Sequence, residues 1–187
     1  REKATSNICT AQVLLAIIAS MYAVYHGPEG LTHIARSVHR RTAVLAAGLR
    51  KLGFKLQSEA FFDTVSVDAG VKQKEIVTRA VAEKINLRTG QGTLEGVLGI
   101  ALDETTTAQT VEAVWRAFGG KLVYAEIARE AGDAIPEGLA RSSAFLTHPV
   151  FHAHRSETEL LRYMRKLSDR DLALDRAMIP LGSCTMK

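Results

Sequence analysis

Residues 97–118 read VLGIALDETTTAQTVEAVWRAF, and this stretch predicts a buried strand that leads into a helix. Residues 97–102 are a short, almost uninterrupted apolar run, which is typical of a strand covered by other elements. Asp103 and Glu104 end the run; they could act as an acid/base pair, but at a strand end we expect them to cap the next helix. Residues 107–118 have helical spacing and include the single tryptophan, Trp115. This succession favours an α/β fold.

Two helices are predicted before this unit. Residues 7–25 carry apolar side chains at helical spacing, the Gly27-Pro28 pair breaks the pattern, and a second periodic segment continues to Gly53. Proline is favoured in the first turn of a helix and glycine just after the last, so both ends of the second helix are marked. We expect its basic cluster on the solvated face: His33, Arg36, His39, Arg40 and Arg41.

Further short elements are expected around this strand. Residues 61–67 (FFDTVSV) and 85–88 (INLR) predict strands, and a short helix is expected to end near Ala131. Residues 71–83 predict a helix with four inward-facing side chains, Ile76, Val77, Ala80 and Val81. The order of elements predicts a small α/β sandwich, with helices on one face of a short sheet.

The pattern changes from Pro136 onward. Residues 158–167 predict a short helix, and Ser156 followed by Glu159 is typical of a capping box. Residues 179–187 (IPLGSCTMK) are either a loop whose hydroxyls and thiol line a site or a disordered tail.

Composition and motifs argue against several classes of protein. The net charge of +4 is modest, the basic residues are scattered, and the few aromatics are not interleaved with them, so a nucleic-acid interface is not indicated. No apolar run has the length of a membrane span. The metalloprotease, hydrolase, P-loop and CxxC motifs are absent. His148, His152 and His154 have weak carboxylate support, so we expect no metal site.

The polar residues before the first helix, Thr5, Ser6 and Asn7, have two interpretations. Each can cap the helix through a short side-chain oxygen, which is the plainer one. A helix N-terminus with hydroxyls beside it also suits an anion such as phosphate. Cys9 and Cys184 make no disulfide framework and fit a reducing compartment. Cys9 could be a nucleophile near a helix N-terminus, but its apolar-periodic position favours packing.

Six blocks spread along the chain resemble one enzyme family. They are REKATSNICTAQ (1–12), MYAVYHGPEGL (21–31), LGIALDET (98–105), FLTHPVF (145–151), HRSETELLRYM (154–164) and MIPLGSCTMK (178–187). The family is the P-protein of the glycine cleavage system, the glycine dehydrogenases (decarboxylating). The first and last blocks are long and unusual, which argues against a chance match.

The resemblance implies a fold-type-I transferase that depends on pyridoxal phosphate. That cofactor is an electron sink when glycine loses carbon dioxide, and the remaining aminomethyl group passes to the lipoyl arm of H-protein. We expect a fragment in which residues 1–132 hold long helices and the small C-terminal α/β sandwich domain of the N-terminal half. Residues 133–187 would be a helical and extended linker into the C-terminal half. The Schiff-base lysine is implied to lie beyond Lys187, so we expect no catalytic residue here and no activity of the fragment alone.

The resemblance also implies roles for particular residues. Thr5, Ser6 and Asn7 are candidates for the phosphate of the cofactor. Ser183 and Thr185 are candidates for hydrogen bonds to cofactor or substrate. Cys9 and Cys184 are candidates for redox sensitivity.

Partners and alternatives follow from the same resemblance. The implied partners are the C-terminal half, lipoylated H-protein, glycine and a second copy of the parent protein. The implied location is the bacterial cytoplasm or, in a eukaryote, the mitochondrial matrix.

A fainter resemblance to cysteine desulfurases implies a carboxylate-binding strand arginine. The block LGIALDET has Ala101 and no arginine, and Arg88 is the nearest basic residue. One alternative is an interaction module that docks H-protein or joins the halves without contacting the active site. Another is a different fold-type-I enzyme, an aminotransferase or desulfurase, against which LGSCTMK argues.

Overall fold

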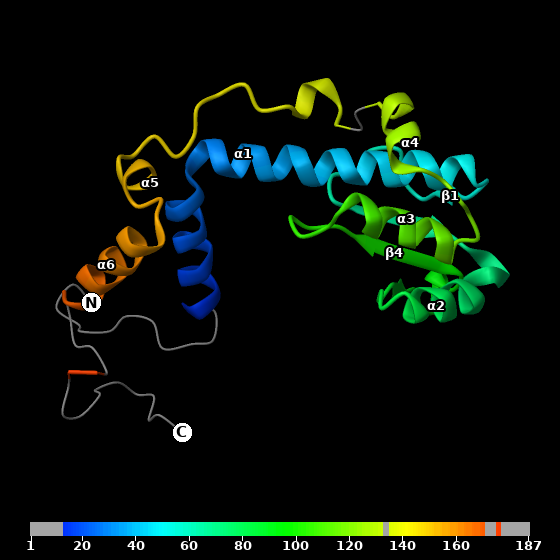
Figure 1. The fold of residues 1–187 in the computed structure, drawn as a ribbon, viewed down its shortest axis with the longest axis horizontal. Helices are drawn as coiled ribbons and strands as arrows, with labels where there is room; N and C mark the ends of the chain where they lie inside the picture. The colour runs from blue at the N-terminus through cyan, green and yellow to red at the C-terminus, as the bar shows by residue number, and fades with distance from the viewer. Residues whose placement is uncertain (1–12, 133–134, 171–174, 177–187) are drawn as a thin grey trace. The chain divides into compact units, whose positions relative to one another are not determined.

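A computed structural model describes residues 13–132, 135–170 and 175–176 of the 187-residue chain (Figure 1). The described residues fall into two compact units, one drawn from Arg1–Thr32 and Ser143–Lys187, the other from His33–Ser142. The helices and strands are α1 (Val13–Lys51), β1 (Lys55–Leu56), β2 (Thr64–Asp68), α2 (Gln73–Ala82), β3 (Arg88–Thr89), β4 (Val97–Ala101), α3 (Ala108–Ala117), α4 (Tyr124–Glu130), α5 (Val150–Ala153) and α6 (Glu157–Ser168). Single 3₁₀ turns occur at Gly70–Lys72, Gly92–Leu94 and Glu137–Leu139.

The long element α1 consists of two helical segments joined at Gly27. The φ of 62° and ψ of −177° at Gly27 lie outside the helical region, and glycine adopts them without a steric penalty. Pro28 then occupies the first turn of the second segment, where its missing N–H costs nothing. The break predicted at Gly27-Pro28 is confirmed, as is the end of the helix just before Gly53. The predicted beginning at Asn7 lies outside the described residues.

The four strands form one antiparallel sheet in the order β1-β2-β4-β3. Its register pairs Val65 with Ile100 and Val67 with Leu98. Because side chains alternate across a strand, these four apolar side chains point to the same face, and all four are buried. The strand predicted over 97–102 is confirmed, with β4 at its centre.

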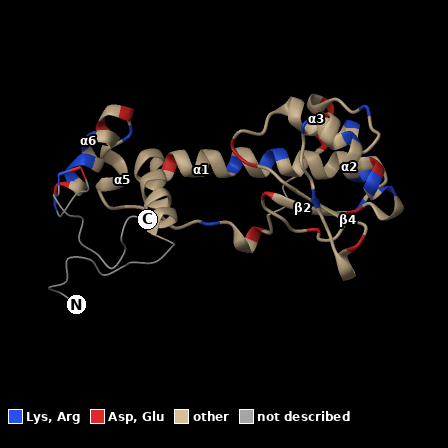
Figure 2. Cartoon of the chain, turned by 90° about the horizontal axis from the view of Figure 1, so that it is seen from below, with Lys and Arg blue, Asp and Glu red and all other residues tan. Residues whose placement is uncertain are grey.

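Helices cover this apolar face of the sheet. Figure 2 shows α2 and α3 on one side of β2 and β4. The core joins the strands to buried side chains of α1, α2, α3 and α4, among them Val44, Leu45, Leu49, Ile76, Val111, Val114, Trp115 and Ile127. The predicted arrangement, helices on one face of a short sheet within a mixed α/β fold, is therefore confirmed.

Trp115 is fully buried and links α3 to α1. Its indole Nε1–H donates a hydrogen bond of 3.1 Å to the carbonyl oxygen of Leu45. A buried indole N–H needs such a partner, because an unpaired polar group in the core is costly. The ring packs directly over Gly48, where a Cβ atom would overlap it. The close approach of α1 and α3 thus depends on the absence of a side chain at residue 48.

The basic cluster on α1 is not entirely solvated, and His39 is the exception. Its ring is 5% exposed, and Nδ1 lies 3.0 Å from the carbonyl oxygen of Phe62. A carbonyl oxygen can only accept, so Nδ1 donates. The Phe62 carbonyl oxygen thus accepts from a side chain and not from a neighbouring strand. The strand predicted over residues 61–67 begins only at Thr64.

The predicted strand over 85–88 is shifted toward its C-terminal end. The N–H of Ile85 donates to the carbonyl oxygen of Ala80 over 2.8 Å and belongs to the termination of α2, so pairing starts at Arg88. On α2 itself, Ile76 and Ala80 are buried as predicted. The prediction that Val81 faces inward is wrong, since its side chain is 58% exposed. Val81 follows the buried Ala80 by one residue, and one residue corresponds to a turn of about 100° around the helix axis.

The helix caps near β4 and α6 differ from each other. Thr107 caps α3 in a reciprocal pair with Thr110, so the expected cap by Asp103 and Glu104 is wrong. Before α6, the Ser156 hydroxyl accepts from the N–H of Glu159 over 3.3 Å, which confirms the N-cap bond of the predicted capping box.

We expect the Gly48→Ala variant to destabilise the unit His33–Ser142 by about 1–3 kcal/mol, because the new methyl group overlaps the Trp115 ring. Helix propensity alone predicts the opposite sign, a gain of up to about 1 kcal/mol. Hydrogen exchange of peptides from α1 and α3 measures the difference. Gly138→Ala is the matched control, since a Cβ there meets no atom within 4 Å. Unchanged exchange in Gly48→Ala would contradict the packing described for Trp115.

Candidate functional site

The residues predicted to contact a cofactor lie outside the described residues. They are Thr5, Ser6, Asn7, Ser183 and Thr185, and the redox candidates Cys9 and Cys184 lie outside as well. Their roles remain predictions. The described part of the chain holds a separate candidate site on its sheet.

The outer face of the sheet, opposite the core, contains a small pocket of about 110 Å³. Ser66 of β2 and Gly99 of β4 are paired across the ladder and lie on this face, since their neighbours Val65, Val67, Leu98 and Ile100 face the core. The lining comprises Gln57, Ser66, Arg88, Gly90, Leu94, Val97 and Gly99. It therefore combines a guanidinium, a hydroxyl and an amide with two apolar side chains.

Arg88 contributes the charge of this pocket. It is paired with Gly99 in the β3–β4 ladder, and its guanidinium lies against that glycine. A Cβ atom at residue 99 would meet the Arg88 Nε atom at 2.7 Å, so only glycine lets the guanidinium lie flat over the sheet. Among the described residues, Arg88 has no hydrogen-bond or ion-pair partner. Sequence reasoning singled out Arg88 as a basic strand residue but could not show what it lies against.

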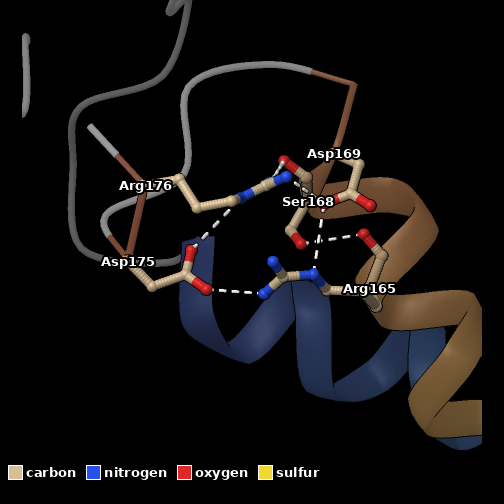
Figure 3. A network of polar contacts seen from close by, with 5 residues as sticks. All are labelled: Arg165, Ser168, Asp169, Asp175 and Arg176. Atoms are coloured by element: carbon tan, nitrogen blue, oxygen red, sulfur yellow. Dashed lines mark hydrogen bonds and ion pairs between the residues drawn. The ribbon is translucent and has the colours of Figure 1, made fainter.

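The other prominent charge cluster, at the end of α6, is neutralised from within (Figure 3). Arg165 pairs with Asp169 at 3.2 Å and with Asp175 at 2.5 Å, and Arg176 pairs with both acids. The hydrogen bond from Arg165 lowers the pKa of the Asp175 carboxyl. Two cations and two anions that satisfy one another leave no charge for a ligand, and this cluster ties residues 175–176 to α6.

A second polar junction surrounds the helix break at Gly27. The Arg155 guanidinium donates to the Glu29 carboxylate at 2.7 Å and to the carbonyl oxygen of Phe151 at 3.2 Å. A Cβ at Gly27 would meet that carbonyl oxygen at 2.6 Å. Two hydrogen bonds lower the pKa of the Glu29 carboxyl. The larger effect comes from the backbone N–H of Glu29 itself, and the next from the Arg155 guanidinium. Arg155 thereby connects the segment after α5 to the break in α1.

The three neighbouring histidines are occupied by local contacts. His148 Nδ1 accepts from the Val150 N–H at 3.2 Å, and the His154 ring stacks on Tyr163 with centroids 4.2 Å apart. His152 donates from Nε2 to the Leu146 carbonyl oxygen and accepts at Nδ1 from Arg155. Within the described ranges, no three His, Cys, Asp or Glu side chains come together as a metal site.

Asp103 organises the loop that follows β4. Its carboxylate accepts from the backbone N–H of Thr105 at 2.9 Å and from the Thr105 hydroxyl at 2.7 Å. The hydroxyl bond is the main cause of a lowered pKa at this carboxyl. The side chain thus stabilises a turn as a carboxylate, which does not suit an acid that must release and regain a proton.

Among the described residues, no helix is both long enough and apolar enough to cross a membrane.

Comparison with known proteins identifies similar sequences along the whole chain. The model of the family "Glycine cleavage system P-protein" matches residues 1–118. Glycine dehydrogenase (decarboxylating) of Bradyrhizobium diazoefficiens is 77% identical over all 187 residues, that of Rhodopseudomonas palustris strain BisA53 73% and that of Bradyrhizobium sp. strain ORS 278 72%. The chain covers 19% of the length of each of these relatives.

We expect the Arg155 contact at the break in α1 to weaken as the pH falls below 4.5, the ordinary pKa of a glutamate. The folded-state pKa of Glu29 is lowered, so its stabilising effect is complete above the ordinary value and is lost as the carboxylate takes up a proton. Hydrogen exchange of peptides around Gly27 should therefore speed up in acid beyond its intrinsic pH dependence.

The Glu29→Gln variant should show the faster exchange already at neutral pH and should lose the additional acid response. Glu157→Gln is the control, because Glu157 is an exposed glutamate in the first turn of α6. If Glu29→Gln exchanges like the unmodified protein at every pH, the carboxylate does not hold the junction.

Proposed function

Because this chain belongs to the glycine cleavage system P-protein family, we propose that it is part of a glycine dehydrogenase (decarboxylating). The match of the family model to residues 1–118 carries this proposal. In the proposed reaction, glycine loses carbon dioxide and its aminomethyl group is transferred to the lipoyl arm of H-protein. Because the chain spans about a fifth of its curated relatives, we assign it one part of this activity and propose that it is inactive alone.

The described fold supports a structural role next to an active site. We propose that residues 1–132 hold the small domain of a fold-type-I transferase and that residues 133–187 lead into the half with the Schiff-base lysine. A sheet covered by helices on one face, within the part matched by the family model, agrees with this division. The proposed lysine lies beyond Lys187.

The outer-face pocket of about 110 Å³ is too small for a phosphorylated pyridine ring, and its lining contains no lysine. We propose that contacts to the cofactor come from the ends of the chain. Thr5, Ser6 and Asn7 would donate to its phosphate, and Ser183 and Thr185 to cofactor or substrate.

The remaining assignments are proposals of the same kind. The parent protein would act as a homodimer together with lipoylated H-protein. Cys9 and Cys184 are proposed as redox-sensitive thiols. The relatives named above are all bacterial, which supports a bacterial cytoplasm.

A second candidate function is a scaffold that holds other parts of the protein or docks H-protein without contacting the active site. The first turns of α1 favour it, because they expose four large apolar side chains to between 48% and 67%: Leu14, Leu15, Ile17 and Ile18. Apolar side chains grouped on one segment mark a contact surface more often than free surface.

The first experiment locates the cofactor lysine in the full-length protein that contains this chain. The protein is saturated with pyridoxal phosphate, reduced with borohydride, digested and analysed by mass spectrometry. We expect the label at a single lysine beyond Lys187, because the resemblance puts the Schiff base there. Specific label on any lysine of this chain would overturn the proposed division of labour, and absence of label anywhere would overturn the cofactor.

A second experiment separates the cofactor contact from the scaffold. We expect the double variant Thr5→Ala plus Asn7→Ala to bind pyridoxal phosphate about tenfold or more weakly, since bonds to a charged group contribute about 1.5–3 kcal/mol. Cofactor affinity and glycine turnover are measured in the full-length protein. Thr78→Ala, which removes an exposed hydroxyl from α2, is the control. If affinity and turnover survive in the double variant, the scaffold explanation stands.

A further inference from the structure

We propose that His152 makes the break in α1 sensitive to pH, because its neutral ring holds Arg155 and its protonated ring releases it. The Gly27 junction comprises Gly27, Glu29, Phe151, His152 and Arg155, which all belong to the unit formed by Arg1–Thr32 and Ser143–Lys187. Its polar centre is a single nitrogen atom, Nη2 of Arg155. The proposed function assigns no role to this junction, so the pH response does not depend on it.

The Nη2 atom of Arg155 has more acceptors around it than hydrogens to donate. A guanidinium NH₂ group carries two hydrogens. Its acceptors are Glu29 Oε2 at 2.7 Å, the Phe151 carbonyl oxygen at 3.2 Å and His152 Nδ1 at 3.2 Å. The carbonyl oxygen accepts at any pH, and the carboxylate accepts until acid protonates it. His152 Nδ1 is therefore the acceptor that a change of pH near neutrality can withdraw.

The contacts of His152 determine what protonation changes. Nε2 lies 3.1 Å from the carbonyl oxygen of Leu146, which can only accept, so Nε2 carries the hydrogen of the neutral ring. Nδ1 then has a free lone pair and accepts from Arg155. A protonated ring keeps the bond to Leu146, while Nδ1 becomes a second donor. Two positively charged donors then face each other across 3.2 Å.

The charged groups that face His152 both weaken the hold of Arg155 once the ring is protonated. Arg155, from the segment after α5, is repelled, and Glu29, from the second segment of α1, attracts the imidazolium. Because Glu29 already accepts from Arg155, the two cations compete for one carboxylate. Two other rings near the junction have contacts of their own. His148 accepts from a backbone N–H of its own turn, and His26 stacks on tyrosines of α1.

Displacement of Arg155 loosens the break in α1. A Cβ atom at Gly27 would overlap the Arg155 guanidinium, so this group packs directly over the break. The same guanidinium donates to the Phe151 carbonyl oxygen and so connects the break to α5. His152 is exposed, and protons reach it from solvent. Protonation of this ring therefore weakens the contact between the break and α5.

The test follows the junction by deuterium exchange and mass spectrometry in the full-length protein that contains this chain. Exchange at the imidazole C2 position gives the titration of each histidine separately. Backbone exchange of peptides around Gly27 and Phe151, corrected for its intrinsic pH dependence, reports the junction. Glu29 stays ionised down to its lowered pKa, which lies below 4.5.

We expect the protection of these peptides to fall about fivefold between about pH 8 and about pH 5.5, with a midpoint at the titration of His152. Two like unit charges about 4 Å apart in water change an equilibrium by roughly that factor. The variant His152→Gln keeps an acceptor for Arg155 and a donor for Leu146 but does not titrate, so it keeps the protection and loses the pH response. His148→Gln is the matched control and keeps the response, since His148 bonds to Val150.

Each outcome decides for or against the role of His152. A response with its midpoint at the titration of His152, absent in His152→Gln and present in His148→Gln, supports it. Equal protection at both pH values overturns it, as does a response that persists in His152→Gln. If His152→Gln exchanges fast already at the higher pH, the amide does not replace the ring, and the midpoint in the unmodified protein decides. A midpoint at the titration of His152 then supports the proposal, and a midpoint elsewhere overturns it.

Discussion

The hydrogen bond from the buried Trp115 indole to the Leu45 carbonyl oxygen connects the two helices on which the larger unit depends. It satisfies the single polar atom of the largest core side chain and holds α3 against α1 at the position of Gly48. The sheet packs under this pair of helices. A change in the spacing of α1 and α3 would therefore expose the inner face of the sheet and disturb the register that positions its outer face.

The two faces of the sheet have different structural roles. The inner face is buried under helices and consists of branched aliphatic side chains, whose packing stabilises the fold. The outer face has Ser66 and Gly99 side by side, and both line a small pocket. Because Gly99 lacks a side chain, the neighbouring strand can place Arg88 across it. The pocket is thus a product of strand pairing and one missing Cβ.

Paired charges explain why the other polar clusters are structural. The pair of Glu29 and Arg155 joins the helix break in α1 to the segment after α5. The pair of Arg165 and Asp175 joins the last turn of α6 to the residues at 175–176. The hydrogen bonds at both places lower the carboxyl pKa values and so favour the charged forms. These pairs are exposed, so each adds little stability, and their effect is to select one local arrangement.

The sequence by itself determined helices α1 to α4 and α6, the break at Gly27-Pro28, the central strand and the membership of the family, whereas the short helix α5 was not predicted. Each rests on neighbours a few residues apart or on contiguous blocks of letters, which a single chain displays directly. Only the tertiary structure decided that His39 is buried against Phe62, that pairing of the last edge strand begins at Arg88, and that this arginine lies over Gly99. These features depend on partners 11 to 23 residues away, and no local periodicity encodes which strand or carbonyl will meet a given side chain.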